Sequence, residues 1–350
     1  MFFASDNSSG VPEQVLASLA RANDGFALGY GADEVMTRVR TRIREIFEAP
    51  EAAIYLVATG TAANALALAT FCTPWGAVYC HRIAHIEEDE CGAPEFYTGG
   101  SKLVLMDGPD GRMDPAVLAA KLDRAAAVGV HNVQKGMLSL TNLTEAGARY
   151  SVADIRALCD IAKAHNLPVH LDGARFTNAL VAEGCTPAEM TWRAGVDVVS
   201  FGGTKNGLMG VEAVVIFDPV KAWEFELRRK RGGHLFSKHR FLSAQMEGWL
   251  DGDLWLDLAR HANAMAERLE AGLARIPGAR LLHPRGGNMV FAEWPRAGHR
   301  AAQDAGARYY FWPFDQSLEG PGDAPVSARL VASWSTTEGH VDRFLDLIST

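Results

Sequence analysis

The chain has little positive charge to offer a polyanion. Its 350 residues carry a formal net charge of -8, and the sequence pI is about 5.8. The densest basic run, residues 228–231, is only four residues long. Proteins that bind nucleic acids need a basic patch or stripe to meet the phosphates. We therefore expect no nucleic-acid partner.

Long apolar runs and paired cysteines are also missing. No uninterrupted apolar stretch approaches the ~18 residues that a membrane span needs. The first ten residues, MFFASDNSSG, show neither a basic n-region nor a long apolar segment, so we expect no secretory signal and no membrane partner. The five cysteines are few, odd in number and never spaced as CxxC, which is typical of free thiols in a reducing compartment. These absences predict a soluble, cytoplasmic protein of enzyme size.

The common nucleotide-binding loops are absent, but one candidate phosphate site is present. Neither a Walker loop nor a GxGxxG fingerprint occurs. Instead, an apolar run at 53–57 leads through Ala58-Thr59-Gly60-Thr61 into an Ala- and Leu-rich segment, a strand–turn–helix pattern. The free N–H groups at a helix start suit a phosphate, with Gly60 and Thr61 as candidates. The alternative is that these residues only cap the helix.

Strands and helices alternate through the first two thirds of the chain. Such alternation predicts a mostly parallel sheet with helices on both faces, whose functional residues lie at the carboxyl ends of the strands. Gly60, Asp172 and Lys205 each follow a predicted strand, so we expect them to converge. The predicted strands of this region are 53–57, 77–80, 102–106, 137–140, 169–171 and 196–201.

The expected organisation has three parts. Residues 1–12 form a polar arm, 13–245 a large α/β domain and 246–350 a smaller C-terminal α+β domain. An arm of this composition is disordered unless other residues tie it down. In the small domain the pattern predicts strands at 279–283, 289–293, 307–311 and 327–333, followed by a helix at 341–348.

Residues 196–217 place a lysine between two apolar runs, in the turn Gly-Gly-Thr-Lys-Asn-Gly. Burying an ammonium group is costly, so burial favours the neutral amine, the form that attacks a carbonyl. Neighbouring glycines allow the backbone a close approach to a ligand. Lys205 is therefore a candidate nucleophile. The alternative is a hairpin lysine that points into water.

Other candidate residues have two interpretations each. Asp172 and Arg175, in HLDGAR, are either functional groups at a strand end or a structural ion pair. His81 and His85 are four residues apart, a spacing seen in zinc sites, but the glutamate of HExxH and a third ligand are missing, so we expect no metal. His85 alone is equally consistent with a buried core histidine, and Arg329 with a surface arginine.

The order of these motifs resembles the low-specificity L-threonine aldolase family, in the β-eliminating lyase group of pyridoxal-phosphate enzymes of fold type I. The similarity extends from FASDN at 3–7, through HRIAHIEEDECGAP, HLDGAR and FGGTKN, to RLVASW at 329–334. It implies pyridoxal 5'-phosphate as the cofactor and an α/β fold with a mostly parallel central sheet plus a smaller C-terminal domain. It also implies cleavage of L-threonine, L-allo-threonine and related β-hydroxy-α-amino acids to glycine and an aldehyde.

The resemblance also implies a role for each candidate residue. Lys205 matches the lysine that forms the Schiff base, and Asp172 matches the partner of the pyridine nitrogen, which must stay protonated for the ring to accept electrons. His85 matches the histidine stacked on the ring. The remaining matches are Gly60, Thr61 and Thr204 for the phosphate, Arg175 near the ring oxygen, and Ser5 and Arg329 for the substrate carboxylate.

The chain departs from the family at one turn. Where some members carry a histidine in a THNG-like turn, this sequence has Thr144-Glu145-Ala146-Gly147. The group that takes the substrate's hydroxyl proton is therefore His85, Glu145 or a bound water. Other reactions on the same scaffold also stay open, namely β-elimination, transamination and non-catalytic binding of the cofactor.

Family members donate phosphate contacts from a neighbouring subunit. The matching segment here is 232–241, with Ser237 and Lys238 as the candidate donors. The resemblance therefore implies a homo-oligomer, a dimer or tetramer, whose site lies at a subunit interface. Closed symmetric assemblies are common among soluble enzymes.

Overall fold

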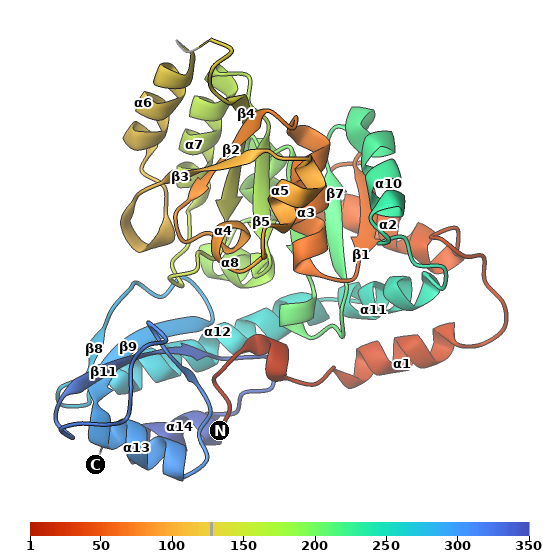
Figure 1. Ribbon diagram of the computed structural model, residues 1–350. Helices are drawn as coiled ribbons and strands as arrows, with labels where there is room; N and C mark the ends of the chain where they lie inside the picture. Colours follow the sequence, from red (N-terminus) through yellow and green to blue (C-terminus); the bar gives the residue numbers. More distant parts are fainter. Residues whose placement is uncertain (127–128, 350) are drawn as a thin grey trace.

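The computed structural model describes residues 1–126 and 129–349 and contains two β-sheets (Figure 1). The larger sheet has seven strands in the order β1-β7-β6-β5-β4-β2-β3. Strand β7 runs antiparallel to both β1 and β6, and the other neighbouring strands are parallel. The predicted mostly parallel sheet is therefore observed. Its strands are β1 (Ala53–Val57), β2 (Gly76–His81), β3 (Lys102–Met106), β4 (Gln134–Thr141), β5 (Val169–Gly173), β6 (Val198–Gly202) and β7 (Glu212–Ile216).

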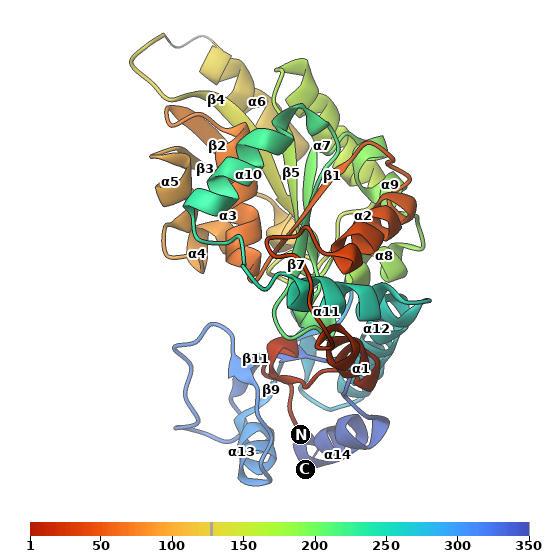
Figure 2. The same ribbon diagram turned by 90° about the vertical axis from the view of Figure 1, so that its right-hand side faces the viewer.

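Helices cover both faces of this sheet (Figure 2). Helices α3 (Gly60–Phe71), α5 (Ala93–Thr98) and α10 (Ala222–Arg231) lie on one face, and α2 (Glu34–Ile46), α7 (Val152–Ala164) and α8 (Phe176–Glu183) on the other. Helix α3 is buried from Ala62 to Thr70, because its small side chains let it pack closely on the strands. A capping box of Ser151 and Asp154 begins α7. Other helices of this region are α4 (His85–Glu88), α6 (Pro115–Ala126) and α9 (Pro187–Met190).

The smaller sheet is antiparallel and packs on helices of the C-terminal part. Its order is β10-β11-β9-β8, and the long helix α12 (Leu254–Leu273) connects it to the larger sheet region (Figure 1). Trp294 and Phe344 are fully buried in its core. The remaining elements are β8 (Arg280–Leu281), β9 (Met289–Pro295), α13 (Arg296–Asp304), β10 (Tyr310–Phe311), β11 (Pro325–Val331) and α14 (Glu338–Ile348). Strands β8 and β10 are two residues long, shorter than the sequence pattern predicts.

The predicted domain limit at residue 245 falls inside helix α11 (Arg240–Leu250). Met246 and Trp249, which follow that limit, pack in the same hydrophobic core as residues of the larger sheet. The division into 13–245 and 246–350 stays a prediction. In the part of the chain that the structure describes, no helix combines the length and the apolar character that crossing a bilayer requires.

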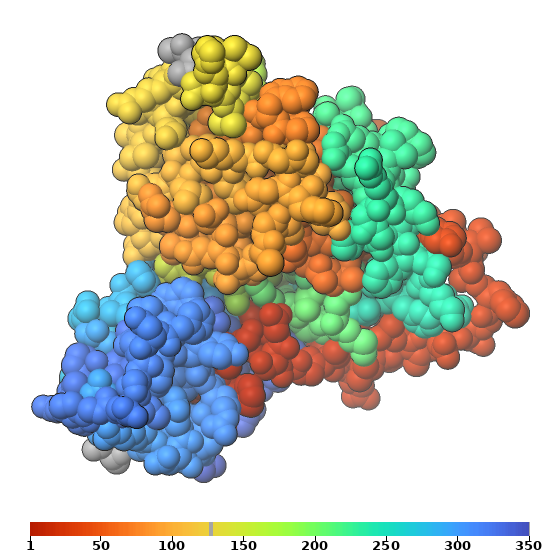
Figure 3. Space-filling view, viewed as in Figure 1, coloured from red at the N-terminus to blue at the C-terminus, as the bar shows by residue number. Residues whose placement is uncertain are grey.

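The N-terminal arm is held in place by both halves of the molecule. Phe3 is fully buried in the C-terminal core, donates its N–H to the Arg308 carbonyl at 2.7 Å and accepts from the Val331 N–H at 2.9 Å. After a short 3-10 turn (Asp6–Ser8), helix α1 (Glu13–Ala22) packs along α11. In Figure 3 the N-terminal residues (red) lie between the C-terminal part (blue) and the rest of the chain. The backbone bonds therefore explain why this polar segment is ordered.

A buried ion pair fixes the arm against the larger sheet. The Asp6 carboxylate accepts from Arg175 Nε at 2.7 Å and Nη2 at 3.0 Å, and from Asn288 Nδ2 at 3.1 Å. Burial acts to raise the pKa of Asp6, but the charges of Arg175 and Lys205, together with these hydrogen bonds, outweigh it and lower that pKa. The carboxylate therefore stays ionised in the interior, as the guanidinium beside it requires.

Replacing Asp6 by Asn should leave the Arg175 guanidinium buried without a counter-charge. We expect the free energy of unfolding to fall by about 3 kcal/mol at pH 7, the scale for breaking a buried pair. Because the folded-state pKa of Asp6 is lowered, its stabilisation is present above the ~3.9 of an unfolded aspartate and is lost as the pH falls through the folded value. Urea unfolding at several pH values, with Asp24→Asn as the exposed control, measures this. Equal stability of Asp6→Asn and the wild type at pH 7 would contradict the assignment.

Candidate active site

A cavity of about 390 Å³ lies at the carboxyl ends of β1, β5 and β6, beside the start of α3. The predicted convergence is observed there. Residues on its wall that the sequence had singled out are Gly60, Thr61, His85, Asp172, Thr204 and Lys205.

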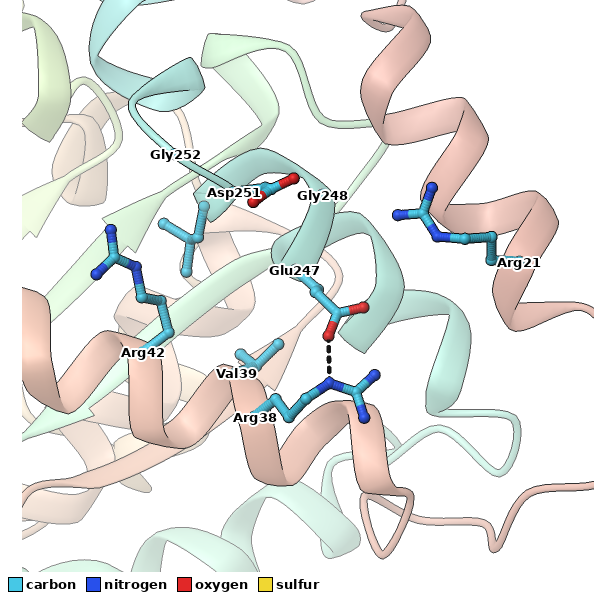
Figure 4. Close-up of a pocket in the computed structure, with 9 residues that line it drawn as sticks. Arg21, Arg38, Val39, Arg42, Glu247, Gly248, Asp251 and Gly252 are labelled. Atoms are coloured by element: carbon cyan, nitrogen blue, oxygen red, sulfur yellow. Dashed lines mark hydrogen bonds and ion pairs between the residues drawn. The ribbon is translucent and has the colours of Figure 1, made fainter.

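A second cavity, of about 410 Å³, lies between α1, α2 and α11 (Figure 4). Its wall carries arginines, and Arg38 pairs with Glu247 at 2.6 Å. Arg21 and Arg42 flank that pair. These are exposed surface charges without a nucleophile or a helix start among them, so the chemistry is assigned to the first cavity.

Lys205 lies in the turn of an antiparallel hairpin formed by β6 and β7. The turn is rigid: Asn206 donates to the Trp255 carbonyl at 2.8 Å, and Trp249 Nε1 donates to the Asn206 carbonyl at 2.9 Å. A side chain at Gly202 would lie 2.5 Å from the Ala174 carbonyl oxygen, so only glycine allows the two strand ends to approach. The hairpin is thus present, but its half-buried lysine lines the cavity rather than extending into water.

Asp172 is the fourth residue of β5 and is almost fully buried. Its Oδ1 accepts from the Ala174 N–H at 3.0 Å, and its Oδ2 accepts from Asn64 Nδ2 at 3.0 Å. Among the residues that the structure describes, Asp172 makes no ion pair with Arg175, whose partner is Asp6. The alternative of a structural Asp172–Arg175 pair is therefore wrong. The carboxylate is oriented by neutral donors and faces the cavity.

His85 begins α4 and is partly exposed to the cavity. Its Nδ1 lies 3.0 Å from Oε1 of Glu90, whose side chain is fully buried. This hydrogen bond raises the pKa of His85, although burial opposes it. His81 contacts different groups, the Gly108 carbonyl and the Ile83 N–H. Within residues 1–126 and 129–349 no group of three His, Cys, Asp or Glu side chains is placed to hold a metal ion.

The start of α3 forms an anion-binding corner of the cavity. Thr59 caps the helix, accepting from the Ala62 N–H through its hydroxyl and from the Ala63 N–H through its carbonyl, both at 3.1 Å. The N–H groups of Gly60 and Thr61 have no hydrogen-bond partner in the described part of the chain. No heavy atom of the described residues outside Gly60, its two chain neighbours and the nearby backbone of its own helix lies within 4 Å of the position that a Cβ on Gly60 would take, so the space beside this residue is open. Two free donors at a positive helix end suit a phosphate.

Thr204 and Glu212 lie on the side of the cavity next to Lys205. The Thr204 hydroxyl accepts from the Val211 N–H at 3.2 Å, and Glu212 accepts from the Gly203 N–H at 2.7 Å. Burial raises the pKa of Glu212 to about 7, with the Thr204 hydrogen bond opposing that shift. Thr204 therefore takes part in holding the turn in addition to facing the cavity.

None of the four predicted substrate-binding residues lies on the cavity wall: Ser5, Arg175, Arg329 and Glu145. The Ser5 hydroxyl accepts from the Asn7 N–H at 3.1 Å and caps the short turn, so that Asn7 lines the cavity instead. Arg329, on β11, lies against the rings of Tyr310 and Trp312, with its guanidinium carbon 5.7 and 5.3 Å from their centroids. Its buried Nε has no partner in the described residues. Arg329 is therefore an oriented, partly desolvated cation.

The charges of Arg175 and Glu145 act on Arg329, and that of Glu145 also acts on His85. Burial lowers the pKa of Arg329, the nearby Arg175 lowers it further, and Glu145 opposes both. Glu145 also acts to raise the pKa of His85. Neither Arg175 nor Glu145 lines the cavity. Arg175 is already paired with Asp6, so Arg329 is the cation of this group that has no ion-pair partner in the described residues, which suits it to a ligand carboxylate.

Sequence reasoning missed four polar residues of the cavity wall. Asn64 and Glu212 carried a usable signal, since each is a polar residue within an otherwise apolar segment. Glu90 is hidden in the acidic run Glu-Glu-Asp-Glu, where pattern alone does not separate it from its exposed neighbours. Asn7 follows Ser5 and Asp6 in the arm, and its position depends on how the arm folds back.

Comparisons with known proteins agree with this geometry. A family model described as beta-eliminating lyase matches residues 3–294. The chain is 39% identical over 340 residues to the low specificity L-threonine aldolase of Pseudomonas sp. (strain NCIMB 10558), covering 97% of this chain and 94% of that protein. It is 40% identical over 335 residues to the low specificity L-threonine aldolase of Pseudomonas aeruginosa, covering 95% and 93%.

The structural comparison extends over the whole chain. A threonine aldolase from Leishmania major superposes with a TM-score of 0.90 at 29% identity, covering 99% of this chain and 98% of that one. The predicted α/β fold of the fold type I class is thereby confirmed. The chain belongs to the β-eliminating lyase family, among proteins similar to the low-specificity L-threonine aldolases.

Proposed function

We propose that the chain binds pyridoxal 5'-phosphate in the cavity at the carboxyl ends of β1, β5 and β6. The donor set fits this cofactor: an amine from Lys205, a buried carboxylate from Asp172, and free N–H groups of Gly60 and Thr61 at a helix start. These groups match the cofactor's aldehyde, its pyridine nitrogen and its phosphate. His85, which lines the same cavity, would stack on the ring. The presence of all these groups in one cavity is the observation that carries the proposal.

The proposed activity is the cleavage of L-threonine, L-allo-threonine and related β-hydroxy-α-amino acids to glycine and an aldehyde. When bound, the cofactor supplies a ring that accepts the electrons of the broken Cα–Cβ bond. Asp172 holds a proton at the ring nitrogen. Lys205 would hold the cofactor through its side-chain amine. The likeness to threonine aldolases over nearly the whole chain supports this reaction.

The substrate's two remaining groups need partners on the protein. Arg329, oriented between two rings and lacking a partner at Nε, is proposed to bind the carboxylate, with Arg175 and Ser5 nearby. A fixed carboxylate and amine set the angle between the Cα–Cβ bond and the ring. His85 is proposed to take the hydroxyl proton through Nε2. Glu145, in place of the family's histidine turn, or a bound water is the alternative base.

Rival reactions share most of this machinery. Asp172, Lys205 and a carboxylate-binding arginine serve transamination and β-elimination as well as aldol cleavage. A base beside the substrate's β-carbon is needed for the cleavage, and His85 provides one. A non-catalytic binding protein would not need Lys205 and Asp172 together. The aldehyde-lyase activity is therefore preferred.

We further propose a cytoplasmic homo-oligomer, a dimer or tetramer, with the site near a subunit interface. All five cysteines are free, which is consistent with a reducing compartment. Met209, on the cavity wall, is 52% exposed, and Phe236 is 40% exposed within the segment 232–241. Ser237 and Lys238 of that segment are the proposed donors to a neighbouring subunit's phosphate. Covering these side chains would remove apolar surface from water.

Replacing Lys205 by Ala should abolish turnover and the visible absorbance of the bound cofactor. Its amine is the only one on the cavity wall among the described residues, so no other lysine replaces it there. The wild type, loaded with pyridoxal phosphate, should release acetaldehyde and glycine from L-threonine without a keto acid. Lys230→Ala, an exposed lysine on α10, is the control. Full colour and activity in Lys205→Ala would refute the assignment, and amino transfer without aldehyde would refute the reaction.

Asp172→Asn should still bind the cofactor but lose most of the cleavage rate. An amide does not stabilise a protonated pyridine nitrogen as a carboxylate does, so the ring accepts electrons less well. We expect kcat to fall at least about 10²-fold, which corresponds to ~2.7 kcal/mol of barrier. Cofactor titration and steady-state kinetics separate the two effects. An activity within a few fold of wild type would mean that the aspartate is only structural.

His85→Phe should retain a ring over the cofactor while removing the base. General bases contribute ~10²–10⁴-fold, so we expect a loss of kcat in that range with little change in cofactor affinity. Aldehyde release from L-threonine and a cofactor titration measure the two quantities. Unchanged cleavage in this variant would transfer the role to Glu145 or a water, which Glu145→Gln would then distinguish.

A further inference from the structure

A buried chain of hydrogen bonds connects the two sides of the cavity. Nδ2 of Asn64, on α3, donates to Oδ2 of Asp172 at 3.0 Å and to Oε1 of Glu90 at 2.9 Å. The same Glu90 oxygen lies 3.0 Å from Nδ1 of His85. One amide therefore links the carboxylate at the end of β5 to the carboxylate that contacts the histidine.

Burying the carboxylate of Glu90 costs free energy that a purely structural role would not require. Its side chain has no exposure to solvent, and its second oxygen, Oε2, has no hydrogen-bond partner in the described residues. A glutamine would accept the same two hydrogen bonds through its single oxygen without the cost of burying a charge. What the glutamine lacks is the negative charge. The group beside Glu90 on which that charge acts is the His85 imidazole.

We propose that Glu90 is the positioning residue for His85: it holds the Nδ1 proton, leaves Nε2 as the nitrogen that faces the ligand, and is itself tethered to Asp172 through Asn64. A carboxylate only accepts, so the Nδ1–H of His85 is the donor in this contact. No partner for Nε2 is found within the described residues. The role of Nε2 as a base rests on the proposed function, whereas the contact and the tautomer do not.

The charges around His85 favour its protonated form. Glu90 raises the pKa of His85 through the hydrogen bond, burial opposes it, and the charges of Glu145 and Asp172 raise it further. Lys205, which lines the same cavity, acts to lower it. Glu90 is the closest carboxylate of this set and the one in direct contact. Its charge, more than its shape, is therefore expected to govern the titration of His85.

The test compares Glu90→Gln with Glu87→Gln in the full-length protein without added cofactor. Glu87 is an exposed glutamate on α4, next to the same histidine, and serves as the matched control. Histidine labelled with ¹³C and ¹⁵N gives the titration of each ring by NMR, and His85→Phe identifies the His85 signal by its loss. We expect the His85 midpoint to move to lower pH in Glu90→Gln and to stay at the wild-type value in Glu87→Gln. An unchanged midpoint in Glu90→Gln overturns the proposal.

The wild type alone provides a second measurement, which does not depend on whether a variant folds. The ¹⁵N shifts of His85 at high pH should report the tautomer with the proton on Nδ1. A proton on Nε2 overturns the proposal. Neither NMR result depends on turnover, so failure of the wild type to cleave L-threonine would count against the proposed function alone.

Kinetics then test the consequence for catalysis. In the cofactor-loaded enzyme, Glu90→Gln should shift the acidic limb of the kcat/KM profile to lower pH. It should also lower kcat roughly tenfold, a part of the ~10²–10⁴ that a positioned base contributes. If Glu90 served only in packing, Glu90→Gln would change the stability of the protein. The acidic limb of its kcat/KM profile would then coincide with that of Glu87→Gln. That result, with an active wild type, contradicts positioning by charge.

Discussion

The buried contact of Asp6 with Arg175 and Asn288 is the constraint on which the arrangement of the site depends. Each partner belongs to a different part of the chain: the N-terminal arm, the loop after β5, and the residue before β9. A desolvated ion pair is stable only when its geometry and its additional hydrogen bonds are complete, so the three parts must meet in one way. The contact also fixes Arg175, three residues after Asp172, the carboxylate of the cavity. Stability and the shape of the site are therefore linked at this point.

Much of the fold was predictable because its signals are local. Buried parallel strands read as short apolar runs, and the turns between them and the helices carry small or capping residues. Convergence of Gly60, Asp172 and Lys205 then follows from topology, since the carboxyl ends of parallel strands share one edge. The direction of β7 was not predictable in this way, because an apolar run does not show which strands pair with it or in which direction they run. The limits of the hydrophobic core around α11 were not predictable either, because they depend on contacts between residues that are far apart in the sequence.

The sequence pointed to Lys205, Asp172 and His85 on the cavity wall, but not to the polar residues that support them. Asn64 and Glu212 are polar residues within apolar segments, and burial of such a residue requires a partner or a function. Glu90 gave no comparable signal, because three acidic residues precede it in a short run and only the folded chain buries one of them. Ser5 shows the reverse case. The sequence marks the right segment, but the turn that it caps presents Asn7 to the cavity instead.

The groups that distinguish one reaction from another are those that contact the substrate rather than the cofactor. Lysine and aspartate are common to the scaffold, so they leave the outcome open. In this chain the turn at 144–147 carries Glu145, whose carboxylate acts on His85 through charge. A histidine held by Glu90 and surrounded by further carboxylates is a stronger base than a free imidazole, but it is also protonated over a wider range of pH. The same charges that strengthen it therefore move its working range towards higher pH.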